Sequence, residues 1–433
     1  MDLLTTNDKQ GEHPASYYAA SANALDRFAP LKGDQSCDVC VIGGGYTGLS
    51  TALHLAQNGF DVILLEAQRV GFGASGRNGG QVGSGQRLEQ NDLEKMLGKP
   101  RAHQLWELAE ESKATVRSLI TQHEIDCSYK PGVLHTELAL KNVRHTAQYV
   151  KKLQDEYGYE KIEFFDREQV CDALGTSAYW GGSMDWGAGH LHPLNFALGL
   201  AKACAKAGVR IYEQSRVREI SRGDPAKVIT NNGAVKADFV ALGANGYLGN
   251  LEPTVANRVM PINNFIVATE PLGEKQARAL IRDNVAVADS KFVVNYFRLS
   301  DDNRLLFGGG ESYGYKFPSD IASKARTPML QIYPQLADTK IDFAWGGTLA
   351  ITMNRMPDFR RLAPNIFSAS GYSGHGVAMA TLAGKLMSEA ICGTATRFDI
   401  MADVPGRSFP GGAMMRSPLL ALAMSWYSFR DRM

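Results

Sequence analysis

The strongest constraint on the fold is a glycine-rich turn that joins an apolar run to a helical pattern. The apolar run at 37–42 leads directly into the sequence G-x-G-x-x-G at 43–48. A helical pattern follows at 49–57, and a second strand pattern at 61–65 ends in Glu66. This order of strand, glycine loop, helix, strand and acid is typical of the Rossmann unit that binds a dinucleotide.

The glycines and the acid of this motif have separate physical tasks. Gly43 permits the tight turn, Gly45 lets the backbone approach a pyrophosphate, and Gly48 lets the helix pack closely on the strand. The start of the helix presents unpaired N–H groups to the phosphate charge. Glu66 stands 18 residues after Gly48, where it can accept hydrogen bonds from a ribose and would repel a 2′-phosphate. The motif therefore predicts FAD or NAD.

Three later segments favour FAD. Residues 71–80 form a run of mostly small residues whose backbone can lie against a flat cofactor. Residues 237–244 resemble the short strand by which flavoproteins return to the nucleotide domain. The segment 371–376 precedes an apolar helical run at 377–390, whose N-terminus would offset negative charge on a reduced flavin. The predicted FAD contacts are Gly43, Gly45, Tyr46, Thr47, Gly48, Glu66, Ala74, Ser75, Arg77, Asn78, Gly79, Gly80, Gln81, Val217, Gly243, Gly374, His375, Gly376 and Val377.

The length of the chain predicts two domains, because 433 residues exceed the size at which one hydrophobic core stops growing. Charge-rich helical patterns dominate 100–160 and successive strand patterns dominate 261–310, unlike the flanking βαβ segments. We expect an α/β fold with a Rossmann-type FAD-binding domain and a discontinuous α+β substrate domain inserted into it. The predicted boundaries are 1–88, 165–252 and 345–405 for the FAD-binding domain, 89–164 and 253–344 for the substrate domain, and 406–433 for a C-terminal tail or helix.

Charge and hydropathy exclude several classes of partner. The chain carries 46 Lys and Arg against 45 Asp and Glu, so it has no broad basic face for nucleic acid. Residues 1–14 lack the basic start and apolar stretch of a secretory signal, and no window approaches 18 uninterrupted apolar residues. We expect a cytoplasmic protein without an integral membrane segment.

The cysteines and histidines do not follow a metal-binding pattern. The 6 cysteines are scattered, as in a reduced cytoplasmic enzyme. Cys37 and Cys40 form a C-x-x-C pair, but they lie inside the apolar run 37–42 and no second pair completes a four-thiolate site, which predicts core thiols. His190 and His192 are followed by a proline and have no cluster of acids or thiols beside them. We expect no bound metal.

Together these motifs resemble the D-amino-acid-oxidase-like superfamily of FAD amine oxidoreductases across essentially the whole chain. The resemblance implies the two-domain arrangement of the glutathione-reductase-2 and D-amino-acid-oxidase-like flavoproteins. Bacterial gamma-glutamylputrescine oxidases are similar in five segments, at 16–23, 73–81, 189–195, 302–306 and 409–412. That family is understood to use FAD and oxygen to convert the primary amine of gamma-glutamylputrescine to an aldehyde, with release of ammonia and hydrogen peroxide.

Two departures from another relative, monomeric sarcosine oxidase, are informative. That family attaches its flavin through a cysteine shortly before the Gly-His-Gly region, whereas 345–353 contains none here, which implies non-covalent FAD. It also binds a substrate carboxylate with a lysine two positions after Gly-His-Gly, where this chain has Ala378. The resemblance therefore implies a longer substrate whose carboxylate lies far from the reacting amine.

Flavin-dependent amine oxidation requires a neutral amine over the flavin and a largely apolar pocket, and the cofactor supplies the electron chemistry. His375 is either a proton acceptor or electrostatic partner, or a residue that positions backbone against the flavin. Tyr372 and Trp345 precede glycine clusters and are candidates to line the amine pocket. Tyr296 and Arg298 lie on a predicted strand, where they either bind a γ-glutamyl carboxylate or belong to a half-exposed sheet surface.

The sequence leaves other functions open. The alternative enzyme is an amino-acid or secondary-amine oxidase or dehydrogenase with a pipecolate-like or sarcosine-like substrate. A third possibility is a flavin-bearing binding or assembly protein. Residues 417–432 have apolar positions at helical spacing and a basic end, as in a membrane-surface helix that delivers electrons to a quinone or a helix that packs on its own domain. The electron acceptor, oxygen or another compound, and the oligomeric state are not specified.

Overall fold

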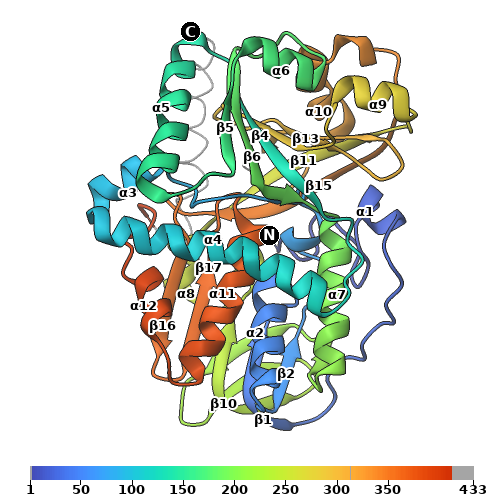
Figure 1. Ribbon diagram of the computed structural model, residues 1–433. Coiled ribbons are helices and arrows are strands. Elements are labelled where there is room, and N and C mark those ends of the chain that lie inside the picture. The colour runs from blue at the N-terminus through green and yellow to red at the C-terminus, as the bar shows by residue number, and fades with distance from the viewer. Residues whose placement is uncertain (1, 313, 412–433) are drawn as a thin grey trace.

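The computed structural model describes residues 2–312 and 314–411 as two stacked sheets with their covering helices (Figure 1). The predicted tail helix at 417–432, and the last residue of the segment 409–412, lie outside the described residues. The lower sheet of Figure 1 contains the two strands of the glycine motif, and the upper sheet contains most of the strands predicted between 261 and 310.

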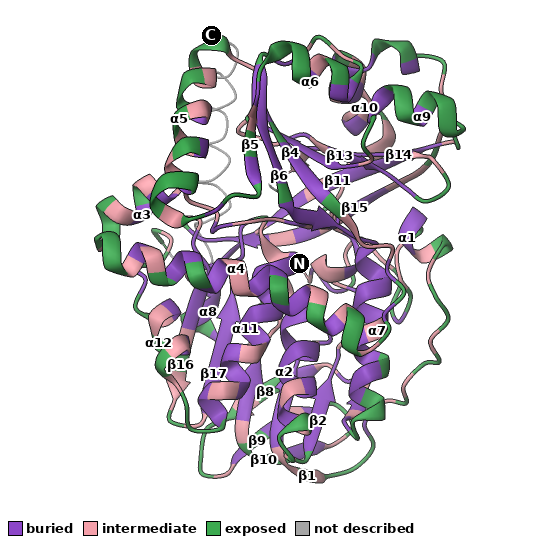
Figure 2. Cartoon of the chain, viewed as in Figure 1, coloured by how far each residue is buried: buried purple, intermediate pink, exposed green. Residues whose placement is uncertain are grey.

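The lower sheet has the order β16-β17-β10-β1-β2-β7, with β8 and β9 as an antiparallel extension on β10. Strand β1 lies between β10 and β2 and is parallel to both. All four residues of β2 are buried, as expected for a central parallel strand (Figure 2). The strands are β1 (Gln35–Ile42), β2 (Val62–Leu65), β7 (Arg210–Tyr212), β8 (Val217–Ser221), β9 (Ala226–Thr230), β10 (Ala234–Leu242), β16 (Asp358–Ala363) and β17 (Ile366–Ser370).

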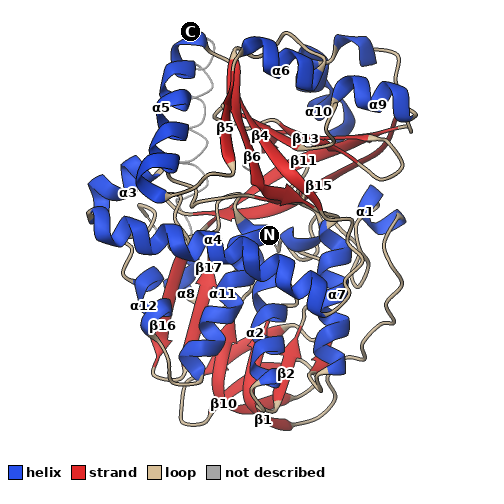
Figure 3. Ribbon diagram, in the orientation of Figure 1, coloured by secondary structure: helices blue, strands red, loops and turns tan. Residues whose placement is uncertain are grey.

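Helices cover one face of this sheet (Figure 3). Apolar side chains of α2, α7 and α11 join those of β1 and β2 in one hydrophobic core. The long helix α4 packs on α11 as an outer layer and adds its own buried side chains to the same core (Figure 1). The helices of this half are α2 (Tyr46–Gln57), α3 (Gln90–Leu97), α4 (Lys99–Gln122), α7 (Pro193–Lys206), α8 (Pro253–Ala256), α11 (Gly376–Ile391) and α12 (Thr396–Ala402).

The upper sheet has the order β15-β11-β14-β13-β12-β4-β6-β3, with β5 paired to β6. Its pairs are antiparallel except for β12 with β4. The strands are β3 (Gln81–Val82), β4 (Lys130–Glu137), β5 (Ile162–Phe165), β6 (Gly181–His190), β11 (Met260–Thr269), β12 (Ala286–Asp289), β13 (Tyr296–Leu299), β14 (Leu305–Ser312) and β15 (Ile341–Ile351).

Helices α6, α9 and α10 cover the face of the upper sheet that points away from the lower one (Figure 1). Their buried side chains form a second core with β4, β13 and β14, and α5 packs beside β5. These helices are α5 (Leu140–Tyr157), α6 (Arg167–Leu174), α9 (Glu274–Leu280) and α10 (Ile321–Ile332), and the remaining short turns are α1 (Tyr17–Ala20), η1 (Ala74–Gly76), η2 (Asn245–Tyr247) and η3 (Pro334–Leu336).

The predicted strand, loop, helix and strand order is confirmed by β1, α2 and β2, although α2 begins at Tyr46 rather than at residue 49. The predicted return strand and late helix are β10 and α11. The fold class is therefore the α/β architecture with an added α+β part that the sequence predicts.

The domain boundaries need correction in three places. Strand β6 lies inside the predicted FAD-binding segment 165–252 but pairs with β4 in the upper sheet. Strand β15 also belongs to the upper sheet, although the predicted boundary falls inside it at 345. Conversely, α4 packs in the lower core although 89–164 was expected in the substrate domain. The chain passes repeatedly between the halves because strand pairing joins residues far apart in sequence.

The cysteines and histidines that were weighed as metal ligands have structural roles in the fold. Cys37 and Cys40 lie on β1, where burial raises the pKa of both thiols. The His192 ring caps α7 by accepting a hydrogen bond from the Asn195 N–H at 3.1 Å, and His190 contacts the Asn284 carbonyl oxygen at 2.8 Å. Among the described residues, no helix is long and apolar enough to cross a bilayer.

We expect Gly48→Ala to destabilise the fold. A Cβ at residue 48 would lie 1.9 Å from the Gly43 carbonyl oxygen, so α2 would have to move away from β1. Overpacking of this kind costs about 1–3 kcal/mol of unfolding free energy, and more where backbone must move. Thermal denaturation of the FAD-free protein measures the loss, so that differences in cofactor binding do not enter. Gly45→Ala is the matched control, because its Cβ would meet only the rotatable Ser75 hydroxyl, at 2.8 Å. Equal stability of Gly48→Ala and the parent would contradict the packing argument.

Candidate cofactor and substrate site

A cavity of about 570 Å³ lies between the two sheets. One wall is formed by the carboxyl ends of β1, β2 and β10 together with the starts of α2 and α11. The other wall is the inner face of the upper sheet, with residues from β4, β11, β13, β14 and β15. Such a crevice at the carboxyl ends of parallel strands is where open α/β sheets bind ligands.

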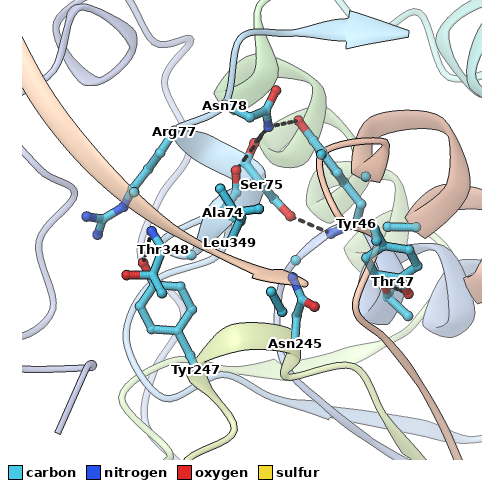
Figure 4. Close-up of a pocket in the computed structure, with 18 of the residues that line it drawn as sticks. Tyr46, Thr47, Ala74, Ser75, Arg77, Asn78, Asn245, Tyr247, Thr348 and Leu349 are labelled. Atoms are coloured by element: carbon cyan, nitrogen blue, oxygen red, sulfur yellow. Dashed lines mark hydrogen bonds between the residues drawn. The ribbon is translucent and has the colours of Figure 1, made fainter. Parts of the chain in front are cut away.

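The glycine loop brings backbone to the cavity. Gly43 has a φ of +107°. A Cβ there would lie 2.8 Å from the Gly243 carbonyl oxygen, so only glycine fits. Gly45 is the N-cap of α2 and offers no side chain to the first turn. The Tyr46 N–H donates to the Ser75 hydroxyl at 3.0 Å (Figure 4). The first turn of α2 is therefore open to an anionic group such as a pyrophosphate.

Glu66 directly follows β2, lines the cavity and is 9% exposed. Its Oε2 accepts a hydrogen bond from the Gly44 N–H at 2.6 Å, and its Oε1 accepts one from the Gln68 N–H at 2.8 Å. Burial raises the pKa of Glu66 to about 7, because desolvation disfavours the carboxylate more than the backbone N–H groups favour it. The carboxylate retains acceptor capacity for ribose hydroxyl groups.

The small-residue loop is held by two of its own side chains. The Asn78 amide donates to the carbonyl oxygens of Ala74 at 3.0 Å and Ser75 at 3.1 Å, and its Oδ1 accepts from the Gly80 N–H at 2.7 Å. Figure 4 shows that Arg77 points away from these groups. Its guanidinium donates to Phe72 O at 2.7 Å, Gly346 O at 3.2 Å and Asp8 at 2.8 Å. Arg77 therefore anchors the loop through its side chain, although its residue lines the cavity.

A second helix start converges on the same cavity. His375 is the N-cap of α11, after Gly374 with a φ of +97°. The hydroxyls of Tyr372 and Thr47 share a hydrogen bond of 2.7 Å, which ties the start of α11 to the start of α2. Burial, together with the charges of Arg87 and His135, lowers the pKa of His375 to about 3. The imidazole is neutral at physiological pH.

A loop after β3 reaches the ring of His375. A Cβ on Gly83 would lie 3.2 Å from His375 Nε2. The loop rests on Lys113, which is 1% exposed and donates to the hydroxyls of Ser84 and, at 2.9 Å, Tyr159. Glu110 lies 2.8 Å from the same ammonium group. This buried ion pair supports the loop from behind and fixes the segment that leads to Arg87.

The upper sheet gives the cavity a mixed wall. The Tyr296 hydroxyl donates to Asn264 Oδ1 at 2.5 Å. Its ring fills space left by two glycines, since a Cβ on Gly79 would lie 2.6 Å from the ring and one on Gly308 would lie 2.1 Å from it. Both apolar and polar side chains also line the cavity, and they include Ala288, Phe292, Val294, Arg87, His135, Asp289, Glu311 and Arg355.

Most of the predicted contacts line the cavity. They are Gly43, Gly45, Tyr46, Thr47, Glu66, Ala74, Ser75, Arg77, Asn78, Gly79, Gln81, Val217, Tyr296, Gly243, Tyr372, Gly374, His375, Gly376 and Val377. Gly48 and Gly80 lie behind it, where a Cβ would collide with the carbonyl oxygens of Gly43 at 1.9 Å and Leu191 at 2.1 Å. These two glycines shape the loops rather than line the cavity.

Trp345 and Arg298 need correction, because neither lines the cavity. Trp345 is 2% exposed, and its Nε1 donates to the Arg77 carbonyl oxygen at 3.1 Å. The Arg298 guanidinium donates to Gly79 O at 2.9 Å, Leu299 O at 3.1 Å and the Tyr18 hydroxyl at 3.3 Å. A substrate carboxylate would have to displace these bonds. Both residues therefore brace the small-residue loop.

The sequence interpretation missed several residues of the cavity. Asn245 has a φ of 45°, and its Oδ1 accepts from the Gly371 N–H at 2.9 Å, which joins the end of β10 to the start of α11. The Tyr247 hydroxyl accepts from the Thr348 N–H at 3.3 Å (Figure 4). Arg87, Glu311 and Arg355 stand in segments without a recognisable motif. Only the position of Asn245 just after the return strand offered a signal.

The arrangement fits FAD. Two helix starts and a ribose-binding acid suit the dinucleotide, and a long wall of glycines and small residues suits a flat ring. The sequence profile of the family described as FAD dependent oxidoreductase (DAO) matches residues 38–390.

Whole-length relatives agree with this profile. The chain is 44% identical over 423 residues to gamma-glutamylputrescine oxidoreductase of Escherichia coli (strain K12), covering 98% of this chain and 99% of the relative. It is 43% identical over 419 residues to the probable oxidoreductase OrdL of Rhizobium meliloti (strain 1021), covering 96% and 97%. Glycine oxidase from Geobacillus kaustophilus superposes with a TM-score of 0.73 at 19% identity, covering 87% of this chain and 100% of that one, which shows a shared fold.

We expect FAD to bind more weakly as the pH is lowered, because Glu66 becomes protonated. Ribose hydroxyls donate to the ionised carboxylate, whereas the pKa of about 7 in the ligand-free protein favours the protonated form below neutrality. Affinity should therefore weaken roughly tenfold between pH 8 and pH 6, as one proton must be released on binding. Fluorescence titration of the apoprotein with FAD measures this. Glu66→Gln should bind more weakly with a flat pH profile, and a slope unchanged in that variant would refute the assignment.

We also expect FAD to be released by acid denaturation. Among the described residues, the cavity wall contains no cysteine, so the thiol attachment of the sarcosine oxidases has no counterpart. Precipitation with acid should leave the yellow colour in the supernatant. Colour retained by the pellet would show a covalent bond to another side chain.

Proposed function

The chain belongs to the DAO family of FAD-dependent oxidoreductases, and we propose that it oxidises the terminal primary amine of gamma-glutamylputrescine. The overall reaction consumes the amine, oxygen and water and yields the gamma-glutamyl aminobutyraldehyde, ammonia and hydrogen peroxide. The protein is an FAD-dependent amine oxidoreductase. The specific substrate and the use of oxygen as the electron acceptor are the parts that we propose. The proposal rests on the whole-length identity of 44% to gamma-glutamylputrescine oxidoreductase.

The cavity is consistent with an elongated amine. Its wall includes the nucleotide loops and the inner face of the upper sheet, where Tyr296 and Ala288 line it. The residue two positions after His375–Gly376 is Ala378, which is buried in α11 and supplies no cation beside the reacting amine. A substrate whose amine reacts at one end and whose carboxylate and ammonium groups lie at the other end suits this arrangement.

Bound FAD supplies the two-electron acceptor for the amine. The protein must hold the amine neutral, exclude water and fix the carbon that loses hydrogen. Apolar walls at Ala288, Phe292 and Val294 disfavour an ammonium charge on the reacting amine. They therefore favour the neutral amine that the reaction needs.

His375 serves this reaction better as a positioning group than as a base. A pKa of about 3 is far below the range in which an imidazole accepts protons efficiently from an ammonium group at neutral pH. Its neutral ring can accept or donate one hydrogen bond from its place at the start of α11. We propose that it orients the substrate and the adjoining backbone.

The substrate assay separates the enzyme hypotheses. Purified enzyme is mixed anaerobically with gamma-glutamylputrescine, putrescine, pipecolate or sarcosine, and bleaching of the flavin absorbance is followed. We expect gamma-glutamylputrescine to bleach it with the highest kcat/KM, by at least about tenfold over putrescine, because remote contacts contribute to transition-state stabilisation. Faster reduction by pipecolate or sarcosine would support the alternative, and no reduction by any of them would favour a binding role. Peroxide formation in air then tests whether oxygen is the acceptor.

A further inference from the structure

Three charged side chains line the same cavity. Arg87 follows β3, Glu311 lies near the end of β14, and Arg355 lies in the turn after β15. All three are half-buried. Glu311 on β14 is the strand partner of Asn264 on β11. The Asn264 side chain accepts a hydrogen bond from the Tyr296 hydroxyl. Glu311 is therefore attached to the same wall that Tyr296 forms.

Arg355 is held in its place by a fixed turn. Its φ of 65° lies in the left-handed region, which is uncommon for a residue other than glycine. The Thr352 hydroxyl donates to the Met356 carbonyl oxygen at 2.7 Å, and the Asn354 Oδ1 accepts from the Met356 N–H at 3.1 Å. The guanidinium carbon lies 5.6 Å from the centre of the Phe292 ring. Backbone strain of this kind concentrates at functional sites.

Arg87 is carried by the loop that rests on Lys113. Burial lowers the pKa of Arg87, the like charge of Arg355 lowers it further, and Glu311 raises it. The three charges therefore act on one another within the cavity. Two half-buried guanidinium groups beside one carboxylate suit a ligand that carries a carboxylate and a cation together.

We propose that Arg87 and Arg355 bind the α-carboxylate of the γ-glutamyl group and that Glu311 binds its α-ammonium. This inference rests on the proposed function and assigns the recognition end of the same site. Eight bonds separate the oxidised carbon of gamma-glutamylputrescine from its α-carbon, or about 10 Å for an extended chain. The zwitterionic headgroup thus binds far from the reacting amine. The apolar walls accommodate the methylene chain between these two ends of the substrate.

Two analogues separate the charges of the headgroup. N-Glutarylputrescine lacks the α-ammonium, and N-(4-aminobutanoyl)putrescine lacks the α-carboxylate. We expect Arg87→Gln and Arg355→Gln to raise KM for gamma-glutamylputrescine and the glutaryl analogue about 10- to 100-fold with little change in kcat, and to leave the aminobutanoyl analogue unaffected. Glu311→Gln should raise KM for gamma-glutamylputrescine and the aminobutanoyl analogue, which carry the ammonium, and should leave the glutaryl analogue unaffected.

The controls distinguish this inference from the proposed function. Arg361→Gln removes an arginine whose side chain is 46% exposed on β16, outside the cavity, and should change none of the KM values. If the parent enzyme does not prefer gamma-glutamylputrescine to putrescine, the proposed function fails. If that preference holds and the three cavity variants retain the parent KM for every substrate, only the headgroup assignment fails.

A binding measurement on the parent enzyme tests the site even if the variants are too unstable to assay. N-Butyl-γ-glutamylamide carries the headgroup and no reacting amine, so calorimetry on the flavin-loaded parent enzyme tests recognition alone. We expect it to bind, and we expect N-butylglutaramic acid, which lacks the ammonium, to bind at least about tenfold more weakly. Equal affinities of the two compounds would overturn the role of Glu311, and the absence of binding by both would overturn the site.

Discussion

The close approach of α2 to the loop after β1 is the contact on which the rest of the site depends. The missing Cβ at Gly48 allows the helix to start directly behind the turn at Gly43. The first turn of α2 then faces the crevice at the carboxyl edge of the lower sheet. The hydrogen bond between Thr47 and Tyr372 carries this constraint to α11, so that two helix starts separated by more than three hundred residues meet at one cavity.

The loop of small residues joins the two halves of the molecule. The Arg77 side chain fixes it to the N-terminal segment and to β15, while the Trp345 and Arg298 side chains donate to its carbonyl oxygens. The Trp345 and Arg298 bonds are made by buried side chains to carbonyl oxygens of residues that lie outside both sheets. Polar contacts with this one irregular segment thus join the upper sheet to the lower half.

Sequence patterns predicted the part of this structure that local backbone chemistry determines. The spacing of the glycines and Glu66 is set by a turn, a helix start and a strand end, and all three are short-range features. The roles of Arg298 and Trp345 were misassigned because their partners, Gly79 and Arg77, are more than 200 residues away. Arg87 and Arg355 could not be identified since no pattern around them distinguishes a cavity side chain from a surface one. The boundaries failed at β6 and α4 for the same reason, which is that long-range pairing decides membership of a sheet or layer.

The repeated passage of the chain between the two halves has a mechanical consequence. Rotation of one rigid domain on another needs a few hinge residues in the connections, and hinge closure is simplest where the connections are few. Over the described residues the chain enters the upper sheet at β3, again from β4 to β6 and again from β11 to β15, and it returns to the lower half each time. The connections act as parallel tethers, and the halves are expected to behave as one rigid unit. Entry of substrate and exit of product then depend on the movement of individual turns at the rim of the cavity, a fast and local motion, rather than on the opening of the whole molecule.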